Sequence, residues 1–554
     1  MSENVKEVVF PQYKAVHLLL PFFAVSMVLL GPIAVSYYLI GSRVIFNLFA
    51  ADSMYYMGIA NNFVKFGVPT LDGETVTNGF HPLWEFMLIA MFKLPAVSHH
   101  DQVYVAFFAS LLLVYATYLM IAWMLMIMLG RWPGLLAILA LFPGVYALCL
   151  EPRRHYFGDP GMLYDINPYS AVNGMETSLS LALWSIFFLT LIVRFRFLAQ
   201  KAPYASYEMG TFFPLGSRIC LAALVLSRLD DGFLIAAIGL FLLTQTAYSL
   251  TERARALFHV VWPAILGFEI YIVFNALTVG VLLPVSAKAK MTFSFRENFH
   301  HLYALFFGHL QNDQWWFIAA RMTPIIFSVL GGIMCIGLGW RHRHILHELS
   351  AGSFKFLLTI AGYFMAMKGI FLFLWVPLWS QGYWYYFSMI LTANAVFACV
   401  IASCFKTGNK ALVAASFYLM VIVLRMPNDI NFLTMSTNNE NYADVAYTLW
   451  NQGDAIRSFL EEKAPGAKLV DSFDGMFVYL LDMPGPTYTR LVSSPGELEK
   501  YKAQGFWQTV IPQGFSIVPD YGYIRPGYVP DIQVVEALHP PSSPVPFLRV
   551  ELKR

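Results

Sequence analysis

Long apolar stretches recur at short intervals from the N-terminus to about residue 426. A helix needs roughly 20 predominantly apolar residues to cross the hydrocarbon core of a bilayer. Eleven stretches approach that length, and we expect each to form a membrane-spanning helix. Their approximate ranges are 15–39, 102–129, 133–150, 176–194, 213–229, 232–250, 257–279, 320–340, 354–378, 383–405 and 411–426. The first is too long for the apolar core of a cleaved signal peptide, so we expect it to remain as an anchor.

Basic residues between these stretches predict the orientation. Segment 83–97 is apolar as well, but Pro82, Lys93 and Pro95 interrupt it, so we expect a helix that lies in or dips into the outer leaflet without crossing. Basic clusters occur before the first span and after each even-numbered span. If the chain crosses the membrane eleven times, all these clusters lie on the same side of the membrane. Basic loops favour the cytoplasmic side, which places the N-terminus inside and the C-terminus outside. The outer loops are then 40–101, 151–175 and 280–319.

The chain changes character after residue 426. Residues 427–554 carry a higher proportion of charged side chains than the rest, with helical periodicity from Tyr442 to Glu462 and strand-like runs from Lys468 to Leu480. Proline and glycine are frequent from Pro484 onward. This pattern predicts a small exported α+β domain with a loop-rich tail. The fold class is therefore a polytopic α-helical membrane protein, residues 1–426, followed by a soluble domain.

Composition excludes several classes of protein. Of the 554 residues, 58% are apolar and 13% are charged, whereas soluble domains usually carry about 25% charged residues. The formal net charge of +2 offers no basic surface for nucleic acid. Five cysteines all lie in apolar stretches, at spacings that match no zinc motif. A cytosolic enzyme, a disordered protein and a nucleic-acid binder are thus excluded.

The first outer loop begins with an acid at the membrane surface. Asp52 follows the apolar run Phe49 to Ala51, and Tyr55 and Tyr56 come directly after it. A carboxylate there is suited to accept a proton from a hydroxyl group or to hold a divalent ion. Asp52 also precedes a helical run, so a structural role as a helix N-cap is the alternative.

The same loop ends in the stretch Thr77 to Trp84, TNGFHPLW, which predicts a turn followed by a proline-initiated helix. Asn78 is placed in the turn. His81 would face the mouth of a cavity if the helix packs beneath the loop, and the alternative is an interfacial histidine bonded to the backbone. Trp84 is also typical of an aromatic membrane belt.

The second outer loop adds a second carboxylate. Glu176 opens the fourth span, where an acid complements the helix dipole, and it is also able to face Asp52 across a cavity. Arg153 lies outside the membrane, against the charge rule, so an anion is a plausible partner for it. Between spans five and six, Ser227 to Gly232 reads SRLDDG, where we expect an internal ion pair.

Two further stretches carry binding chemistry. Lys288 and Lys290, in LLPVSAKAK, lie at the outer surface, where lysine suits a lipid phosphate; the alternative is a pair of lysines that reach for head groups. The stretch Ser380 to Phe387 includes Trp384 and Tyr385. Aromatic side chains of this kind form membrane belts or pack on sugar rings.

Taken together, these segments resemble the GT-C superfamily of membrane glycosyltransferases, which use polyprenyl-phosphate sugars on the non-cytoplasmic face. The resemblance rests on Asp52 with its two tyrosines, on Asn78 to Trp84, on NGMETSL (Asn173 to Leu179), on SRLDDG and on LLPVSAKAK. The branch that it is most similar to contains bacterial arabinofuranosyltransferases, in which a soluble C-terminal domain follows the last span. The chain departs from the pattern in one respect, since Ala51 stands where many members carry a first acid.

The resemblance implies roles for these residues. Asp52 would be the general base or orient the acceptor, and Glu176 would be a second acid at the site. Lys288, Lys290 and Arg153 would stabilise the departing lipid phosphate, in a direct displacement with inversion. The aromatic residues, Asn78 and His81 would contact substrate. A divalent cation, Mg²⁺ or Ca²⁺, held by Asp52 stays an open alternative.

The resemblance also implies partners and a location. The partners are a polyprenyl-phosphate-linked sugar, a glycan, lipid or protein acceptor, and the bilayer. The location is a bacterial inner membrane. A transporter or flippase for a lipid-linked or anionic substrate is the rival interpretation; scarce ionisable residues within the spans and missing repeat symmetry disfavour it. A non-catalytic scaffold is a third, and it leaves the first outer loop unexplained.

Overall fold

The computed structural model describes most of the chain. The described residues are 15–142, 168–201, 212–245, 248–286, 293–308, 312–340, 349–378, 381, 385–405, 408–434, 442–472, 474–488, 495–521 and 529–553.

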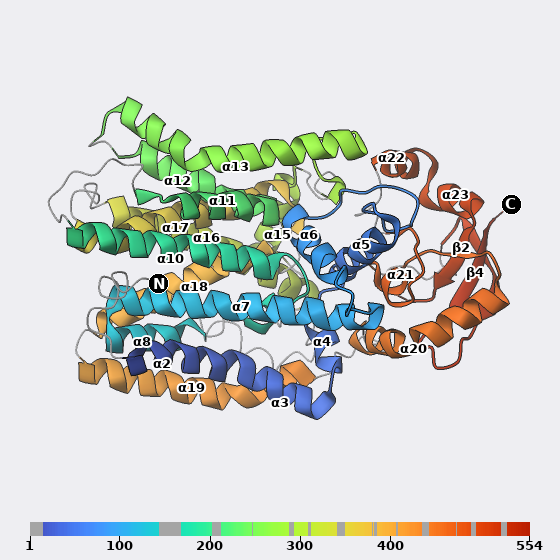
Figure 1. The fold of residues 1–554 in the computed structure, drawn as a ribbon, viewed down its shortest axis with the longest axis horizontal. Coiled ribbons are helices and arrows are strands. Elements are labelled where there is room, and N and C mark those ends of the chain that lie inside the picture. The colour runs from blue at the N-terminus through green and yellow to red at the C-terminus, as the bar shows by residue number, and fades with distance from the viewer. Residues whose placement is uncertain are drawn as a thin grey trace.

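A bundle of long helices, lying side by side, makes up the larger part of the molecule (Figure 1). It consists of α2 (Ala15–Val25) with its π-helical continuation (Ser26–Leu30) and α3 (Gly31–Ile40), α7 (His99–Leu129), α8 (Arg131–Leu141), α10 (Thr177–Lys201), α11 (Leu215–Ser227), α12 (Phe233–Leu243), α13 (Leu250–Val279), α16 (Asn312–Trp340), α17 (Leu349–Trp375), α18 (Phe387–Cys404) and α19 (Gly408–Thr434). Each of the eleven apolar stretches overlaps a helix of this bundle.

Length and composition identify fewer spans than the sequence predicted. Within the described residues, five helices are long and apolar enough to cross a membrane: Leu19–Ile40, His99–Leu129, Thr177–Leu198, Leu250–Val279 and Leu357–Trp375. Others are shorter apolar helices, such as Leu215–Ser227 and Phe387–Ala402. The count of eleven spans therefore stays a prediction, while the helical membrane-protein architecture is confirmed.

The backbones of α16 and α17 approach each other closely. A Cβ added to Gly332 in α16 would lie 2.6 Å from the carbonyl oxygen of Gly362 in α17. Small residues at such crossings let two helix backbones approach closely. Close packing of this kind stabilises helix pairs in a bilayer, where the surrounding lipid is itself apolar and the hydrophobic effect does not drive helices together.

Short elements gather at one end of the bundle. These are α4 (Arg43–Leu48), α5 (Ser53–Phe66) and α6 (Pro82–Phe92), which lie between the bundle and the C-terminal domain (Figure 1). Helix α6 has 11 residues, too few to cross a bilayer, as expected for segment 83–97. Another short helix, α15 (Phe295–Phe307), is attached to the end of α17 by a hydrogen bond from the backbone N–H of Ser294 to the carbonyl of Leu374.

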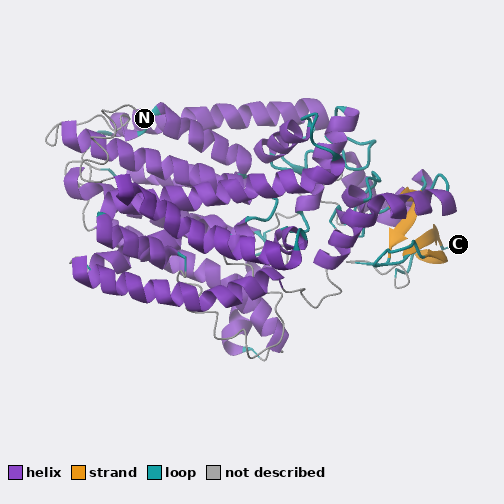
Figure 2. Cartoon of the chain, turned by 60° about the horizontal axis from the view of Figure 1, so that its bottom comes forward, coloured by secondary structure: helices purple, strands orange, loops and turns teal. Residues whose placement is uncertain are grey.

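The C-terminal domain has its own sheet and helices, and its strands lie at one end of the molecule (Figure 2). The helices are α20 (Tyr442–Lys463), α21 (Met476–Leu480), α22 (Pro495–Gln504) and α23 (Phe506–Val510). The strands β1 (Lys468–Leu469), β2 (Phe515–Pro519), β3 (Ile532–Leu538) and β4 (Phe547–Leu552) follow the order β1-β2-β4-β3. Only the β1–β2 pair is parallel among these strands. The expected small α+β unit is present.

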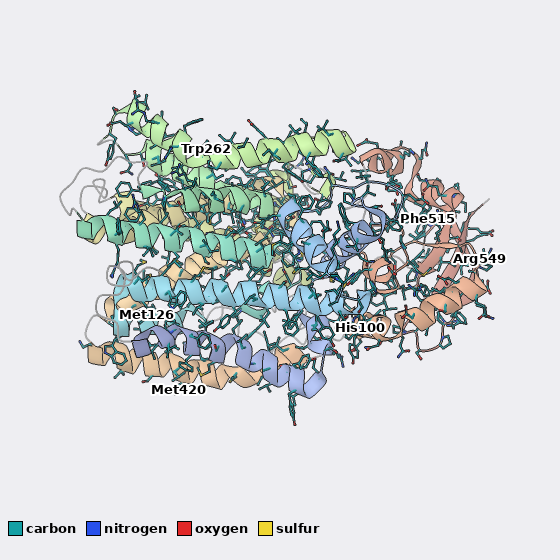
Figure 3. All side chains as sticks on the ribbon, in the orientation of Figure 1. His100, Met126, Trp262, Met420, Phe515 and Arg549 are labelled. Atoms are coloured by element: carbon teal, nitrogen blue, oxygen red, sulfur yellow. The ribbon has the colours of Figure 1, made fainter. Side chains whose placement is uncertain are left out.

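Aromatic stacking fixes this domain to the bundle. The ring of Trp450 in α20 stacks on His100 at the start of α7, with centroids 3.9 Å apart, and also contacts Phe46 in α4. Figure 3 labels His100 at this junction. Arg43 pairs with Asp444 beside it. Because α4 and α7 both contribute, the domain has a defined place against the membrane part.

Candidate functional site

The first and second outer loops are joined by hydrogen bonds. The backbone N–H of Ala50 donates to the carbonyl of Asn173 at 3.1 Å. The indole N–H of Trp84 donates to the carbonyl of Gly174, also at 3.1 Å. Trp84 is fully buried, so it fixes the second loop and is not a surface anchor of the kind a membrane belt requires. These bonds bring the turn containing Asp52 next to the loop that leads into Glu176.

Asn78 attaches the third outer loop to the same place. Its side-chain oxygen accepts from the backbone N–H of Val285 at 3.1 Å, and its amide donates to the carbonyl of Leu283 at 3.3 Å. Asn78 is buried. The residue predicted to touch substrate therefore holds the start of the stretch LLPVSAKAK against the stretch TNGFHPLW.

Buried charges then connect four helices at this end of the bundle. The guanidinium of Arg228 contacts Glu176 at 2.9 Å and Asp230 at 2.9 Å. The ammonium group of Lys368 contacts Asp230 at 2.8 Å and Asp231 at 2.5 Å. We call these five residues the charge network. The ion pair expected within Ser227 to Gly232 is present and is part of a larger arrangement.

Two serines complete the shell around Asp231. The hydroxyl of Ser388 in α18 lies 2.8 Å from Lys368 and donates to Asp231 at 2.7 Å. Ser180 in α10 donates to the other carboxylate oxygen. A charge removed from water is tolerated when it is both paired and hydrogen-bonded. Asp231 meets both conditions, so the network is a stable part of the fold.

Opposing effects set the charge of Asp230. Burial by itself would raise the pKa of its carboxyl group, but Arg228 and Lys368 hold that pKa well below its ordinary value. Asp230 is therefore ionised at neutral pH, and the network contains permanent charges.

Glu176 connects the charge network to the first outer loop. It is only 1% exposed, and Nε2 of His81 lies 3.8 Å from its Oε1. The hydroxyl of Tyr56 in α5 faces it, and burial together with the Glu176 carboxylate raises the pKa of Tyr56 well above the ordinary value. The ring of Tyr385 lies over the guanidinium of Arg228, with 4.9 Å from Cζ to the ring centroid. Tyr56, His81, Glu176 and Tyr385 thus meet in one site.

Asp52 lies one helical turn before Tyr56 in the chain. It occupies the N-cap position of α5, but its side chain makes no capping hydrogen bond, so the structural alternative considered for it is not supported. Its backbone is right-handed helical (φ −57°, ψ −20°), which places it on the same helix face as Tyr56, four residues on. The side chain is half-buried, unlike that of Glu176.

Tyr55 is directed elsewhere. Its hydroxyl donates to Oδ1 of Asp474 in the C-terminal domain at 2.6 Å. The two adjacent tyrosines therefore contact different partners, Tyr55 the C-terminal domain and Tyr56 the site around Glu176. Of the remaining predicted residues, Arg153, Lys288, Lys290 and Trp384 lie outside the described residues.

Lys368 is the residue that sequence reasoning missed. The signal was available, since it is the one charged residue between Leu357 and Trp375. An ionisable residue within a spanning helix is expensive to bury and usually functional.

The described residues do not form a divalent-cation site. No group of three or more histidine, cysteine, aspartate or glutamate side chains among them could hold a metal ion. The acids that do cluster are neutralised by Arg228 and Lys368. This donor set does not fit Mg²⁺ or Ca²⁺.

Comparison with known proteins leaves the family open. No protein-family model and no curated protein matches the chain. A solved structure of ArnT from Cupriavidus metallidurans bound to undecaprenyl phosphate is similar over 95% of this chain and 98% of that chain, with 11% identity and a TM-score of 0.49. The apo form of the same protein gives 11% identity and a TM-score of 0.49 over 94% and 98% of the two chains. Likeness at this level assigns neither a family nor an activity, so function has to be argued from the site.

Proposed function

We propose that this protein is an integral-membrane glycosyltransferase that moves a sugar from a polyprenyl-phosphate donor to a glycan, lipid or protein acceptor. One observation carries the proposal. Four polar stretches, far apart in the sequence, meet at one end of an apolar helix bundle near Glu176, and Asp52 lies two residues after Ala50, whose backbone bonds to Asn173. A lipid-linked substrate needs this combination, an apolar surface for its chain and a polar site at the membrane boundary.

The different roles that we propose for Glu176 and Asp52 follow from how deeply each side chain is buried. Glu176 is enclosed and held by Arg228, so it suits the task of fixing charge within the site. Asp52 is half-exposed and suits contact with an acceptor. In the proposed step the acceptor oxygen attacks the anomeric carbon, Asp52 takes the hydroxyl proton, and the bond from that carbon to the phosphate oxygen breaks. The polyprenyl phosphate leaves with the bonding electrons.

The negative charge on the departing phosphate calls for cations at the site. Arg228 and Lys368 are already engaged by carboxylates. Lys288, Lys290 and Arg153, on the outer loops, therefore remain the proposed phosphate ligands. Asn78 supports this role for the two lysines, because it fixes the loop at Leu283 and Val285, a few residues before them. Arabinofuranose is the sugar we propose, on the sequence resemblance alone.

The proposed location is the bacterial inner membrane, with the site and residues 427–554 on the outer face. The orientation is supported by the basic clusters in the sequence. The site and the C-terminal domain lie at the same end of the bundle, so a single orientation serves both (Figure 1).

Transport of a lipid-linked or anionic substrate is the second candidate, and one observation favours it. Lys368 is a fully buried charge within a spanning helix, the kind of residue that transport pathways use. Its pairing with Asp230 and Asp231 is equally consistent with a fixed structural charge.

One experiment separates the two candidates. The purified protein in lipid nanodiscs, given radiolabelled polyprenyl-phosphate sugar and membrane acceptor fractions, should form a new glycosidic product. The same donor in sealed proteoliposomes tests movement between leaflets. Product formation in nanodiscs, where no second compartment exists, supports the transferase. Movement of intact donor without product would support the transporter and exclude the proposed function.

A further inference from the structure

Helix α5 lies between the C-terminal domain and the site, and two adjacent residues contact the two sides. The Tyr55 hydroxyl donates to Asp474 of the C-terminal domain at 2.6 Å, and both side chains are buried. The next residue, Tyr56, faces Glu176. Neighbouring residues on a helix point about 100° apart, so one rigid helix carries both contacts. A shift of α5 at Tyr55 would displace Tyr56 as well.

The C-terminal domain contacts α5 a second time, farther along the helix. Asp482 accepts a hydrogen bond from the Asn61 amide at 3.0 Å and pairs with Lys65. Arg457 of α20 contacts the same carboxylate at 3.4 Å, which ties Asp482 to the domain's own helix. Asp474 and Asp482 stand on either side of α21. This short helix therefore lies against α5 with one carboxylate at each end.

The backbone at both aspartates is left-handed, with φ of 47° at Asp474 and 54° at Asp482. Non-glycine residues adopt this region at an energetic penalty, aspartate and asparagine most readily. Such conformations persist where their surroundings enforce them and often occur at functional contacts. Between them, Gly475 (φ 81°) approaches α5 so closely that a Cβ would lie 2.8 Å from Cδ1 of Tyr55. The local geometry of α21 is matched to Tyr55.

We propose that Asp474 is a positioning residue for the site: through Tyr55 it fixes α5 so that Tyr56 meets Glu176. In this arrangement the C-terminal domain is part of the framework of the site. The effect on catalysis rests on the proposed transferase function, whereas the effect on α5 does not.

Three variants isolate the contact. Tyr55→Phe removes the hydroxyl and leaves the ring. Asp474→Gly removes the carboxylate, and glycine adopts the left-handed backbone without strain. A change in hydrogen exchange or in activity would therefore not come from backbone strain. Asp474→Asn also accepts that backbone and keeps an oxygen that accepts the tyrosine hydrogen bond. The three together separate the hydrogen bond from packing and from backbone conformation.

Two matched controls accompany them. Tyr38→Phe makes the same chemical change at a tyrosine that is 88% exposed. Lys468→Gln breaks another contact between the C-terminal domain and the membrane part, the exposed pair with Glu74, which involves no residue of α5. Neither control should alter α5 or the site.

Two measurements on the full-length protein in nanodiscs give the readout. Hydrogen exchange of the α5 amides should become about tenfold faster or more in Tyr55→Phe and Asp474→Gly, as expected for loss of one hydrogen bond to a carboxylate. Combining the two changes should add little, because both remove the same bond. In the transfer assay, kcat should fall about tenfold while KM for the donor stays near that of the parent. Asp474→Asn should remain close to the parent in both.

The exchange result decides the proposal. Unchanged exchange across α5 in both Tyr55→Phe and Asp474→Gly would overturn it, whatever the kinetics. Equal acceleration in Lys468→Gln would also overturn it, since the effect would then belong to domain docking in general. If the parent transfers no sugar, the proposed function fails, and the exchange measurement still tests the positioning of α5.

Discussion

At the scale of single residues, a substitution at Asp52 distinguishes a catalytic role of this residue from a structural one. Asparagine caps helices about as well as aspartate, and the Asp52 side chain makes no capping hydrogen bond. An amide takes up no proton at neutral pH. We therefore expect Asp52→Asn to fold and insert normally, with sugar transfer reduced at least about 100-fold. Transfer kinetics and thermal unfolding of the purified variant test this.

A matched change at an exposed acid controls for loss of charge. Asp454→Asn alters a side chain that is 95% exposed and should leave transfer unchanged. If Asp52→Asn transfers sugar within a few-fold of the parent, Asp52 is not the base. Glu176 would then be the next candidate, despite its pairing with Arg228.

Lys368 allows a prediction about stability. Lys368→Met keeps an unbranched chain of similar length and removes the cation that faces Asp231. Breaking a buried ion pair from one side destabilises a protein by about 3–5 kcal/mol. We expect a clear fall in the unfolding temperature, measured in nanodiscs, and no change for the exposed Lys410→Met. A Lys368→Met protein as stable as the parent would show that Ser180 and Ser388 satisfy Asp231 by themselves.

The sequence allowed the candidate residues to be found only where the signal was local. Asp52 and Glu176 could be proposed as candidates because each lies beside an apolar run that is predicted to end at a membrane boundary. The partnership of Lys368 with Asp231 joins residues 137 positions apart, and no local pattern specifies it. Tyr55 was expected to touch substrate, but its hydroxyl bonds to Asp474, 419 positions away. Side-chain partners of this kind require the fold.

At the scale of elements, Asn78 connects the first and third outer loops. Asn78→Ala removes both hydrogen bonds to the segment from Leu283 to Val285, each worth about 0.5–1.5 kcal/mol. Under the proposed function, the loop that carries the two lysines would be held less firmly. We expect KM for the donor to rise several-fold while kcat changes less, measured by steady-state transfer.

The exposed Asn451 of α20, whose amide bonds to the Tyr447 carbonyl, provides the control for that change. Asn451→Ala should leave KM unchanged. An Asn78→Ala enzyme with lower kcat and unchanged KM would place Asn78 in support of the reacting groups and not of donor binding.

The positions of the helices in the chain could be predicted from the sequence, whereas the contacts between them could not. The eleven apolar stretches overlap helices because a helix satisfies its backbone hydrogen bonds within the segment itself, as a single apolar run in a bilayer requires. Helix α6 was recognised as too short to span, since prolines bound it. The contact between α21 and α5 depends on left-handed aspartates, which the sequence does not reveal.

At the scale of the whole molecule, the orientation can be tested by labelling. In a variant lacking the five native cysteines, Gln533→Cys places a thiol on the exposed face of β3. Thr251→Cys places one at the start of α13, at the end of the bundle far from the C-terminal domain (Figure 1). An impermeant reagent applied to intact cells should label the first and not the second. The reverse result would put the site in the cytoplasm and exclude an outer-face donor.

The buried lysine also constrains how the protein is made. A lysine at the centre of a helix opposes insertion into the bilayer by about 2.5–3.5 kcal/mol on translocon scales. Asp230 and Asp231 precede Lys368 in the chain, so both carboxylates are synthesised before α17 leaves the ribosome. We therefore expect α17 to enter the membrane efficiently only beside the hairpin of α11 and α12. Biogenesis of the bundle would then proceed in a fixed order, and a chain from which that hairpin is deleted would leave α17 to quality-control proteolysis.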